Sequence, residues 1–241
     1  MRVTFIGTSH GAPEPHQKCT CVMIEIEQQL YFVDMGTNAV EALCSRGLSA
    51  NNVKGIFITH MHNDHTNGLF QFADLLAWRY KNASPVVCLP NLKAAELITE
   101  WLKINLDARE RPISYRETKP GIVYNDGTLT VTAIPTQHCV NSYAYLFEAE
   151  GKSVLFTGDL KRPGIDFPTI ARERALDLLV CEGAHFEATE YLPVFEQCDI
   201  KHVCVTHYYL PHMISVLQLR QELINRGLPV TIATDDCEIT V

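Results

Sequence analysis

The sequence lacks several features that would place it in other classes of protein. None of its stretches reaches the ~18 consecutive apolar residues that a membrane-spanning helix needs. Residues 1–6 already resemble a strand and lack the apolar core of a signal peptide, so we expect a cytoplasmic protein. The nine cysteines are odd in number and scattered, which favours buried thiols in a reducing compartment over a disulfide framework.

Positive charge is also scarce. Lys and Arg number 20 against 28 Asp and Glu, the formal net charge is -8, and no run of Lys or Arg is longer than two. Proteins that bind long nucleic acids usually present a basic face that neutralises many phosphates. We therefore expect no extended nucleic-acid binding, whereas a small phosphodiester attracted by bound cations remains compatible with this charge.

No linker, low-complexity segment or short internal repeat interrupts the chain. With 46% hydrophobic residues, 241 residues are enough to bury one full core. The sequence therefore predicts a single domain that spans residues 1–241.

Hydrophobic patterns predict a mixed α/β protein. Strands are expected at 2–8, 21–26, 30–34, 55–59, 86–89, 176–181, 201–206 and 230–234, with hairpins around the turn signals at 125–127 and 150–151. Helices are expected at 69–80, from the N-cap Asn91 onward, at 185–197 with a break at Pro193, and at about 213–227. Trp78 and Trp101 stand at helical spacing beside aliphatic residues, so we expect both to pack in the core.

The most informative segment is His60-Met61-His62-Asn63-Asp64-His65, which lies between a predicted strand and a predicted helix. Imidazoles and a carboxylate on such a loop suit zinc, iron or manganese better than calcium. A single histidine is often a helix cap or a buried hydrogen-bonding group, but this cluster predicts metal ligands. The motif supplies four candidate ligands, His60, His62, Asp64 and His65, which are too few to hold two metal ions.

Further candidate ligands follow other predicted strands. His138 follows 131–137, Asp159 follows 154–158, His207 follows 202–206 and Asp34 follows 30–33. The ends of strands in α/β sheets are where functional sites collect, so these side chains are expected to converge on the motif.

This ordered set resembles the metallo-β-lactamase-fold hydrolases. The resemblance implies a four-layer αββα sandwich in which His60, His62 and His138 hold one metal ion. It further implies that Asp64, His65 and His207 hold a second ion, that Asp159 bridges the two, and that Asp34 orients the metal-binding loop. The implied cofactors are two divalent ions, zinc by preference, with manganese or iron also compatible.

Within that superfamily, the details resemble the ribonuclease Z and small phosphodiesterase branch. The opening Phe5-Ile6-Gly7-Thr8-Ser9 and the segment His65-Thr66-Asn67-Gly68-Leu69 carry this resemblance. The chain departs from the tRNA-processing enzymes because only 20 residues separate His138 from Asp159, which leaves no room for their tRNA-gripping arm. It also has Cys181 where they have a histidine that contacts the scissile phosphate, and His185 is a candidate substitute.

The resemblance implies metal-assisted hydrolysis of a small or nucleotide-like phosphodiester by a metal-bridging hydroxide. Asp64 is expected to orient that hydroxide or accept its proton, and His185 to protonate the leaving alkoxide or steady a phosphoryl oxygen. The alternative for His185, which stands near a predicted helix start, is a helix cap or a surface residue. The alternatives are hydrolysis of a lactone, thioester or amide, a ribonuclease Z-like tRNA 3′-processing activity without the arm, and a non-catalytic binding module. The last is disfavoured because none of the seven ligand positions is missing. Relatives in this branch often form homodimers, which the resemblance makes an expectation here.

The remaining prominent side chains have less specific interpretations. His10 and His16 are expected to be solvated loop residues, and His202 a surface residue. His212 either lines the pocket or caps the last helix. Cys139 and Cys204 neighbour candidate ligands and are expected to serve packing.

Overall fold

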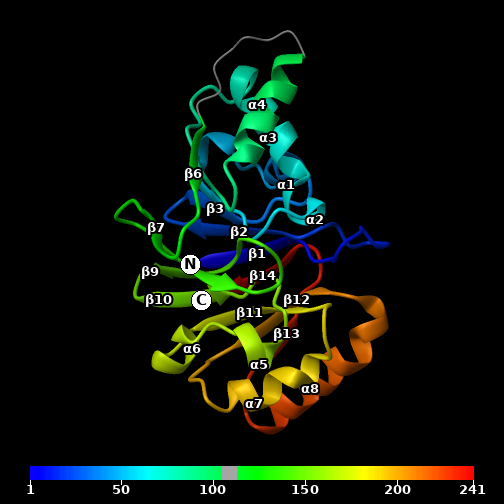
Figure 1. Cartoon of the computed structure of the whole chain (residues 1–241). Coiled ribbons are helices and arrows are strands. Elements are labelled where there is room, and N and C mark those ends of the chain that lie inside the picture. The colour runs from blue at the N-terminus through cyan, green and yellow to red at the C-terminus, as the bar shows by residue number, and fades with distance from the viewer. Residues whose placement is uncertain (105–112) are drawn as a thin grey trace.

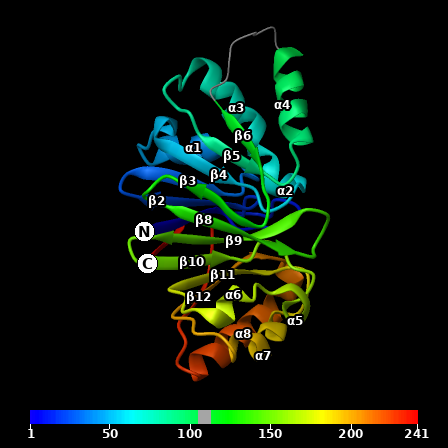
Figure 2. The same cartoon turned by 60° about the vertical axis from the view of Figure 1, so that its left-hand side comes forward.

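Two β-sheets lie face to face, and helices cover the outer surface of each (Figures 1 and 2). The computed structural model describes residues 1–104 and 113–241, and within them each sheet has seven strands. The order in the first sheet is β14 (Cys237–Thr240), β1 (Arg2–Gly7), β2 (Cys21–Ile26), β3 (Gln29–Val33), β4 (Val53–Phe57), β5 (Val86–Leu89) and β6 (Ser114–Glu117). The order in the second is β13 (Val230–Ile232), β12 (Val203–Tyr208), β11 (Leu178–Gly183), β10 (Lys152–Phe156), β9 (Ser142–Ala149), β8 (Thr130–Thr136) and β7 (Gly121–Asn125).

Each sheet combines an antiparallel half with a parallel half. Strands β3 to β6 pair in parallel in the first sheet, and β10 to β13 pair in parallel in the second. Parallel strands need crossover connections, and these carry most of the helices. The carboxyl ends of β4, β10, β11 and β12 are consequently free to present loops and side chains at one edge of the sandwich.

The helices form the two outer layers. The first sheet is covered by α1 (Ala39–Ser45), the short α2 (Asn63–Thr66), α3 (Gly68–Trp78) and α4 (Lys93–Ile104), with the 3-10 turn η1 (Ala50–Asn52). The second is covered by α5 (Pro163–Asp166), α6 (Ile170–Glu173), α7 (Leu192–Phe195) and α8 (Met213–Asn225), with the turns η2 (Ala188–Tyr191) and η3 (Leu210–His212). The predicted four-layer αββα sandwich is confirmed.

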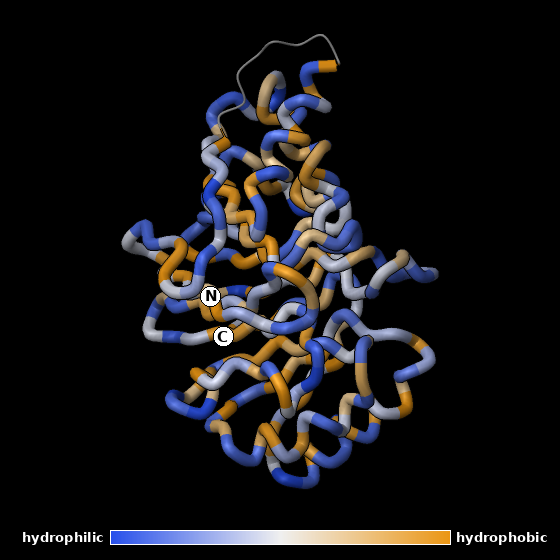
Figure 3. Tube along the Cα trace, viewed as in Figure 1, coloured by the Kyte–Doolittle hydropathy of each residue, from blue (hydrophilic) through white to orange (hydrophobic). Residues whose placement is uncertain are grey.

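Three apolar layers stabilise this arrangement. The layer between the sheets contains the aromatic side chains of Phe5, Tyr31, Phe57 and Phe147, all fully buried. The other two layers lie between each sheet and its own helices. Figure 3 shows the corresponding apolar stretches along the strands, where both faces must exclude water.

Most predicted elements are present. Strand 86–89 and the helices beginning near 68 and 213 agree closely, whereas α1, α5, α6, β6 and β14 were not predicted. The segment 185–197 forms only the two short turns η2 and α7. The prediction that Trp78 and Trp101 pack in the core is wrong, since they are 50% and 61% exposed. Among the described residues, the longest helices are too short or too polar to cross a bilayer.

Candidate metal centre

The histidine-rich motif occupies the connection from β4 into α2, as its flanking sequence predicts. His60 is fully buried, and Asp64 and His65 lie in the single turn of α2. This connection packs directly on the backbone that follows β3, where the amide of Met35 donates to the carbonyl of His65 at 2.8 Å. The amide of Gly68 in turn donates to the carbonyl of Met35 at 2.7 Å. The two backbone segments therefore hold the motif rigidly in place.

Gly36 allows this close approach, because a Cβ atom there would lie 1.6 Å from the carbonyl oxygen of Asp64 and 2.8 Å from that of Thr20. Replacement by alanine must therefore shift backbone rather than rotate a side chain. We expect Gly36→Ala to lower the free energy of unfolding by about 3 kcal/mol, the upper part of the range for overpacking. Urea unfolding measures the change, and elemental analysis measures metal retention.

Gly164→Ala is the matched control, since nothing lies within 4 Å of a Cβ atom at that position. Equal stability of the two variants would show that the contact between Gly36 and the motif does not constrain the loop.

The other candidate ligands come from the second sheet. His138 follows β8 and Asp159 follows β10, while His207 lies inside β12 near its end. His207 and Asp34 both have left-handed backbones, with φ of 47° and 57°. Such a conformation is unfavourable for a residue with a side chain and persists where the surrounding structure fixes it. All seven predicted ligand positions are thus brought to one edge of the sandwich.

Asp159 is at the centre of the cluster. Its Oδ2 atom lies 3.6 Å from Nε2 of His60, 3.6 Å from Nε2 of His65 and 3.3 Å from Nε2 of His207. Nε2 of His138 is also 3.6 Å away. A carboxylate oxygen at this distance from four imidazole nitrogens is placed to serve two metal ions at once.

The donor atoms fall into groups with metal-ligand spacing. His60, His62 and His138 form one, Asp64, His65 and His207 form another, and within each the donor atoms lie within 4.8 Å of one another. His65 provides the test of whether these residues suit a cation. Its Nε2 atom is buried without a hydrogen-bond partner, while its Nδ1 atom lies 2.7 Å from Asp34. An imidazole held in this way by a carboxylate directs a free nitrogen into the cluster, as a metal ligand requires.

Electrostatics favour the ligating forms of His60, His138 and Asp159, whereas burial of His65 is outweighed by the carboxylates of Asp34 and Asp159, which raise its pKa. Burial, reinforced by the neighbouring His65, lowers the pKa of His60 to about 2, so this imidazole is neutral and can donate its lone pair. Burial also lowers the pKa of His138. For Asp159, burial opposes ionisation, but the neighbouring His207 and His65 outweigh it and hold the pKa well below the usual range. The carboxylate is therefore available as an anion.

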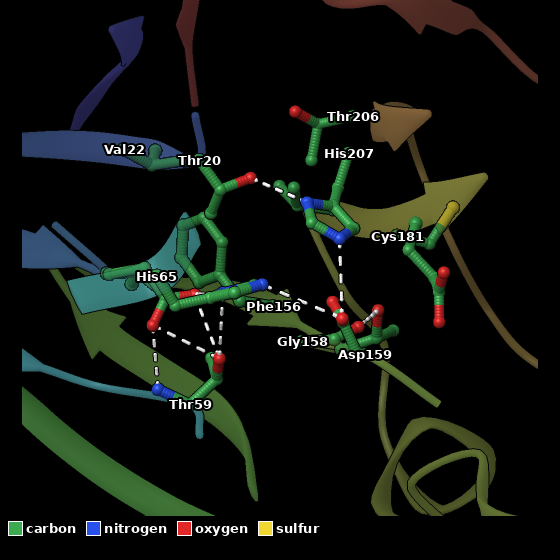
Figure 4. A pocket seen from close by; sticks show the side chains of 15 residues that line it. Thr20, Val22, Thr59, His65, Phe156, Gly158, Asp159, Cys181, Thr206 and His207 are labelled. Atoms are coloured by element: carbon green, nitrogen blue, oxygen red, sulfur yellow. Dashed lines mark hydrogen bonds and ion pairs between the residues drawn. The ribbon is translucent and has the colours of Figure 1, made fainter. Parts of the chain in front are cut away.

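A second set of hydrogen bonds orients the donors. Asp34 accepts from the backbone amide of Thr59 at 2.8 Å and from its hydroxyl at 2.9 Å, in addition to its contact with His65. The hydroxyl of Thr20 lies 2.8 Å from Nδ1 of His207, as Figure 4 shows. The backbone amide of Gly11 donates to Oδ2 of Asp64 at 2.8 Å. Asp34 thus contacts the loop that carries the motif, and its orienting role stays a prediction, whereas Thr20 and Gly11 were not predicted.

His185 lies beside the cluster on its solvent-accessible side. Its side chain is 35% exposed, its ring centroid is 4.6 Å from that of His138, and its Nδ1 atom is 3.8 Å from Oδ2 of Asp159. Burial lowers its pKa, but the hydrogen bond and charge of Glu182 outweigh this and raise the pKa to about 9. The structure thus places His185 within reach of a molecule bound at the cluster.

Sequence reasoning missed two carboxylates that organise the surrounding loops. Glu182 contacts His185, and Asp166 accepts from the backbone amides of Gln137, Lys161 and Arg162 at 2.7, 2.9 and 3.1 Å. Asp166 thereby ties the residue before His138 to the segment after Asp159. Each residue also has one partner that is distant in sequence, Gln137 for Asp166 and Leu160 for Glu182, and no local pattern reveals these contacts.

The other histidines divide between the mouth of the site and the surface. The ring of His10 lies 4.4 Å from that of Tyr209 and 6.2 Å from that of His207, while His16 is exposed. His212 precedes α8 without a side-chain capping bond, and its ring lies 5.5 Å from that of Tyr209. His202 hydrogen-bonds Thr231 at 2.9 Å.

The two cysteines next to candidate ligands differ in burial. Cys204 is buried between the sheets, as predicted, whereas Cys139 is partly exposed.

A cavity of about 30 Å³ is lined by Asp34, His65, Asp159 and His207, together with the apolar side chains of Val22, Val33, Phe156 and Val180. Figure 4 shows His65, Asp159 and His207 around it. A space of this size holds about one water molecule. His62 and His185 are exposed, so a substrate can reach the cluster on their side.

Comparisons with known proteins agree with this architecture. Ribonuclease BN of Cronobacter sakazakii is 29% identical over 171 residues, which is 68% of this chain and 55% of that protein. The human short-form tRNase Z structure gives a TM-score of 0.77 at 20% identity and covers 100% of this chain and 99% of that one. The metallo-β-lactamase fold protein YhfI of Bacillus subtilis gives 0.79 at 16% identity, with 99% and 98% covered.

The curated ribonucleases are longer than this protein, which spans between 50% and 66% of the length of those it matches. The structural matches show the metallo-β-lactamase fold. A sequence profile described as anti-Pycsar protein Apyc1 matches residues 1–182. Because that match covers 182 of the 241 residues, the chain belongs to the anti-Pycsar protein Apyc1 family.

Proposed function

We propose that this protein is a binuclear metal-dependent hydrolase that cleaves a small or nucleotide-like phosphodiester. The observation that carries the proposal is the convergence of seven donor side chains, four of whose imidazole nitrogens lie 3.3 to 3.6 Å from Oδ2 of Asp159, with Nε2 of His65 buried and without a hydrogen-bond partner. Buried histidine nitrogens are normally hydrogen-bonded, so this arrangement is best explained by cations.

In this proposal, one cation is held by His60, His62 and His138 and the other by Asp64, His65 and His207. Asp159 lies between the two sets and contributes to both. When bound, two such ions supply a water molecule of lowered pKa and neutralise charge on the phosphoryl oxygens. The donor set suits zinc best, with manganese or iron also compatible.

Two side chains of the chain itself are assigned to proton transfer. Oδ2 of Asp64 is fixed by the amide of Gly11, and we assign its other oxygen to orienting the attacking water and accepting its proton. His185 stands on the accessible side beside His138, and we assign it to protonating the leaving oxygen of the diester. Each transfer requires the donor and acceptor to be within hydrogen-bond reach in the bound complex.

A small substrate is favoured over a long RNA. The 20 residues between His138 and Asp159 are occupied by the hairpin of β9 and β10, so this segment carries no extended arm. A net charge of -8 also disfavours a long polyanion. The relatives named ribonucleases cleave, by that name, the same type of phosphodiester bond, which supports the choice of bond.

Metal removal and a substrate panel test the proposal. We expect chelation followed by gel filtration to abolish hydrolysis of bis(p-nitrophenyl) phosphate, and about two equivalents of zinc or manganese to restore it. The panel also contains chromogenic lactones and thioesters and a precursor tRNA analysed on a gel. Exclusive turnover of a lactone or thioester would reject the phosphodiester assignment, and specific tRNA 3′ cleavage would replace the small substrate with RNA.

A further inference from the structure

Glu182 is a carboxylate that the proposed ligand set leaves without a role. It lies near the end of β11 and is 2% exposed. A buried carboxylate is strongly unfavourable unless hydrogen bonds replace its hydration, so its partners indicate its role.

The two oxygens of Glu182 have different partners. Oε1 accepts from the backbone amide of Leu160, the residue after Asp159, at 2.6 Å. Oε2 lies 2.6 Å from Nδ1 of His185 and accepts from the backbone amide of the same residue at 3.1 Å. It also accepts from the amide of Ala184 at 3.3 Å. One side chain thus connects the loop that carries Asp159 to the imidazole of His185.

This contact determines which nitrogen of His185 is available. Oε2 already accepts from two backbone amides, so we assign the proton of the 2.6 Å contact to Nδ1, which donates to Glu182 and leaves Nε2 for a bound molecule. The backbone contacts at the same oxygen prevent the carboxylate from rotating away, since the amides of Ala184 and His185 both point at it. The orientation of the ring is therefore set by Glu182 rather than by solvent.

We propose that Glu182 is a positioning residue that acts through His185, holding the protonated ring by the hydrogen bond from Nδ1 and directing Nε2–H at the leaving oxygen of the substrate. In the step, the oxygen of the attacking water bonds to phosphorus and its proton passes to Asp64. The bond from phosphorus to the leaving oxygen breaks, its electron pair stays on that oxygen, and a proton passes to it from Nε2. The proton on Nδ1 stays there throughout, hydrogen-bonded to Glu182, and water returns a proton to Nε2 afterwards. This inference rests on the proposed phosphodiesterase function.

The test compares two diesters that differ in their need for a proton. The nitrophenolate of bis(p-nitrophenyl) phosphate leaves without protonation, whereas the phenolate of diphenyl phosphate is more basic and benefits from an acid. We expect Glu182→Gln to lower kcat on diphenyl phosphate by about 100-fold and on the nitrophenyl ester by less than about 10-fold, with unchanged metal content. The glutamine keeps an oxygen for Leu160 but places an amide group where Nδ1–H donates.

A double-mutant cycle separates positioning from structural support. If Glu182 acts through His185, the Glu182→Gln/His185→Ala double variant is no slower than His185→Ala alone. Further loss in the double variant, or equal loss on both diesters, would overturn the proposal. Should Glu182→Gln fail to fold, Glu182→Asp keeps the charge, withdraws it from the ring and is expected to show the same selective loss.

A spectroscopic measurement remains informative whatever the substrate is. We expect the metal-loaded protein to show a downfield proton resonance from Nδ1 of His185 that disappears in His185→Ala and in Glu182→Gln. Its persistence in Glu182→Gln would refute the positioning contact. Failure of the wild type to hydrolyse either diester while this resonance behaves as expected would reject the proposed function and leave the positioning of His185 intact.

Discussion

Asp159→Ala is expected to abolish turnover of bis(p-nitrophenyl) phosphate, with a fall in kcat of about 10³-fold or more. Four imidazole nitrogens lie 3.3 to 3.6 Å from the one carboxylate oxygen that this change removes. Without it, the two proposed ions lose their shared ligand, and the charge stabilisation that a metal pair supplies, several kcal/mol, is lost with it. Steady-state kinetics combined with elemental analysis measures both effects.

Two further variants make the result specific. Asp159→Asn keeps the shape but not the charge, so we expect a similar fall in rate with less damage to folding. Asp199→Ala is the control, because Asp199 is exposed and precedes the opposite end of β12. An unchanged rate with a full complement of metal in Asp159→Ala would contradict the bridging assignment, and a comparable loss in Asp199→Ala would point to general instability.

The architecture could be predicted where the pattern is local. The apolar run 55–59 and the helical spacing after residue 68 predict β4 and α3 because each buries a continuous face within one segment. Strand β14 is different: it is four residues long and exists through its pairing with β1 at the other end of the chain. Helical spacing correctly predicted that Trp78 and Trp101 lie in helices, but it did not predict that both side chains are exposed. Periodicity does not tell which side of a helix faces the sheet.

The residues of the site also differ in whether local sequence could predict them. The seven candidate ligands could be predicted because a metal cluster requires His and Asp at fixed places after strands, and the resemblance supplied their grouping. Glu182, Asp166 and Thr20 could not, because each acts through partners that the fold brings together, such as the amide of Leu160 or the ring of His207. Its position after a strand made Asp34 a candidate, but only the resemblance suggested its orienting role, although its three contacts follow the ordinary chemistry of a buried carboxylate.

His185→Ala is expected to lower kcat on diphenyl phosphate, whose leaving group needs a proton, by about 10²-fold, equivalent to ~2.7 kcal/mol of transition-state stabilisation, while both metal ions stay bound. The metal measurement matters because His138, Asp159 and His185 also have donor atoms within 4.8 Å of one another. The structure favours an acid over a ligand, since Nδ1 of His185 is engaged by Glu182 and the side chain is 35% exposed. Retention of two ions with a reduced rate supports that choice.

His202→Ala provides the matched control for this loss, because His202 bonds Thr231 at the other end of β12 and should leave both rate and metal content unchanged. Loss of one ion in His185→Ala would reassign the residue as a ligand. Wild-type kinetics would remove it from the reaction and leave Asp64 as the remaining candidate for proton transfer. A reduced rate with both ions in place therefore identifies His185 as a proton donor, because removal of a ligand would weaken the binding of the metal ion that it holds.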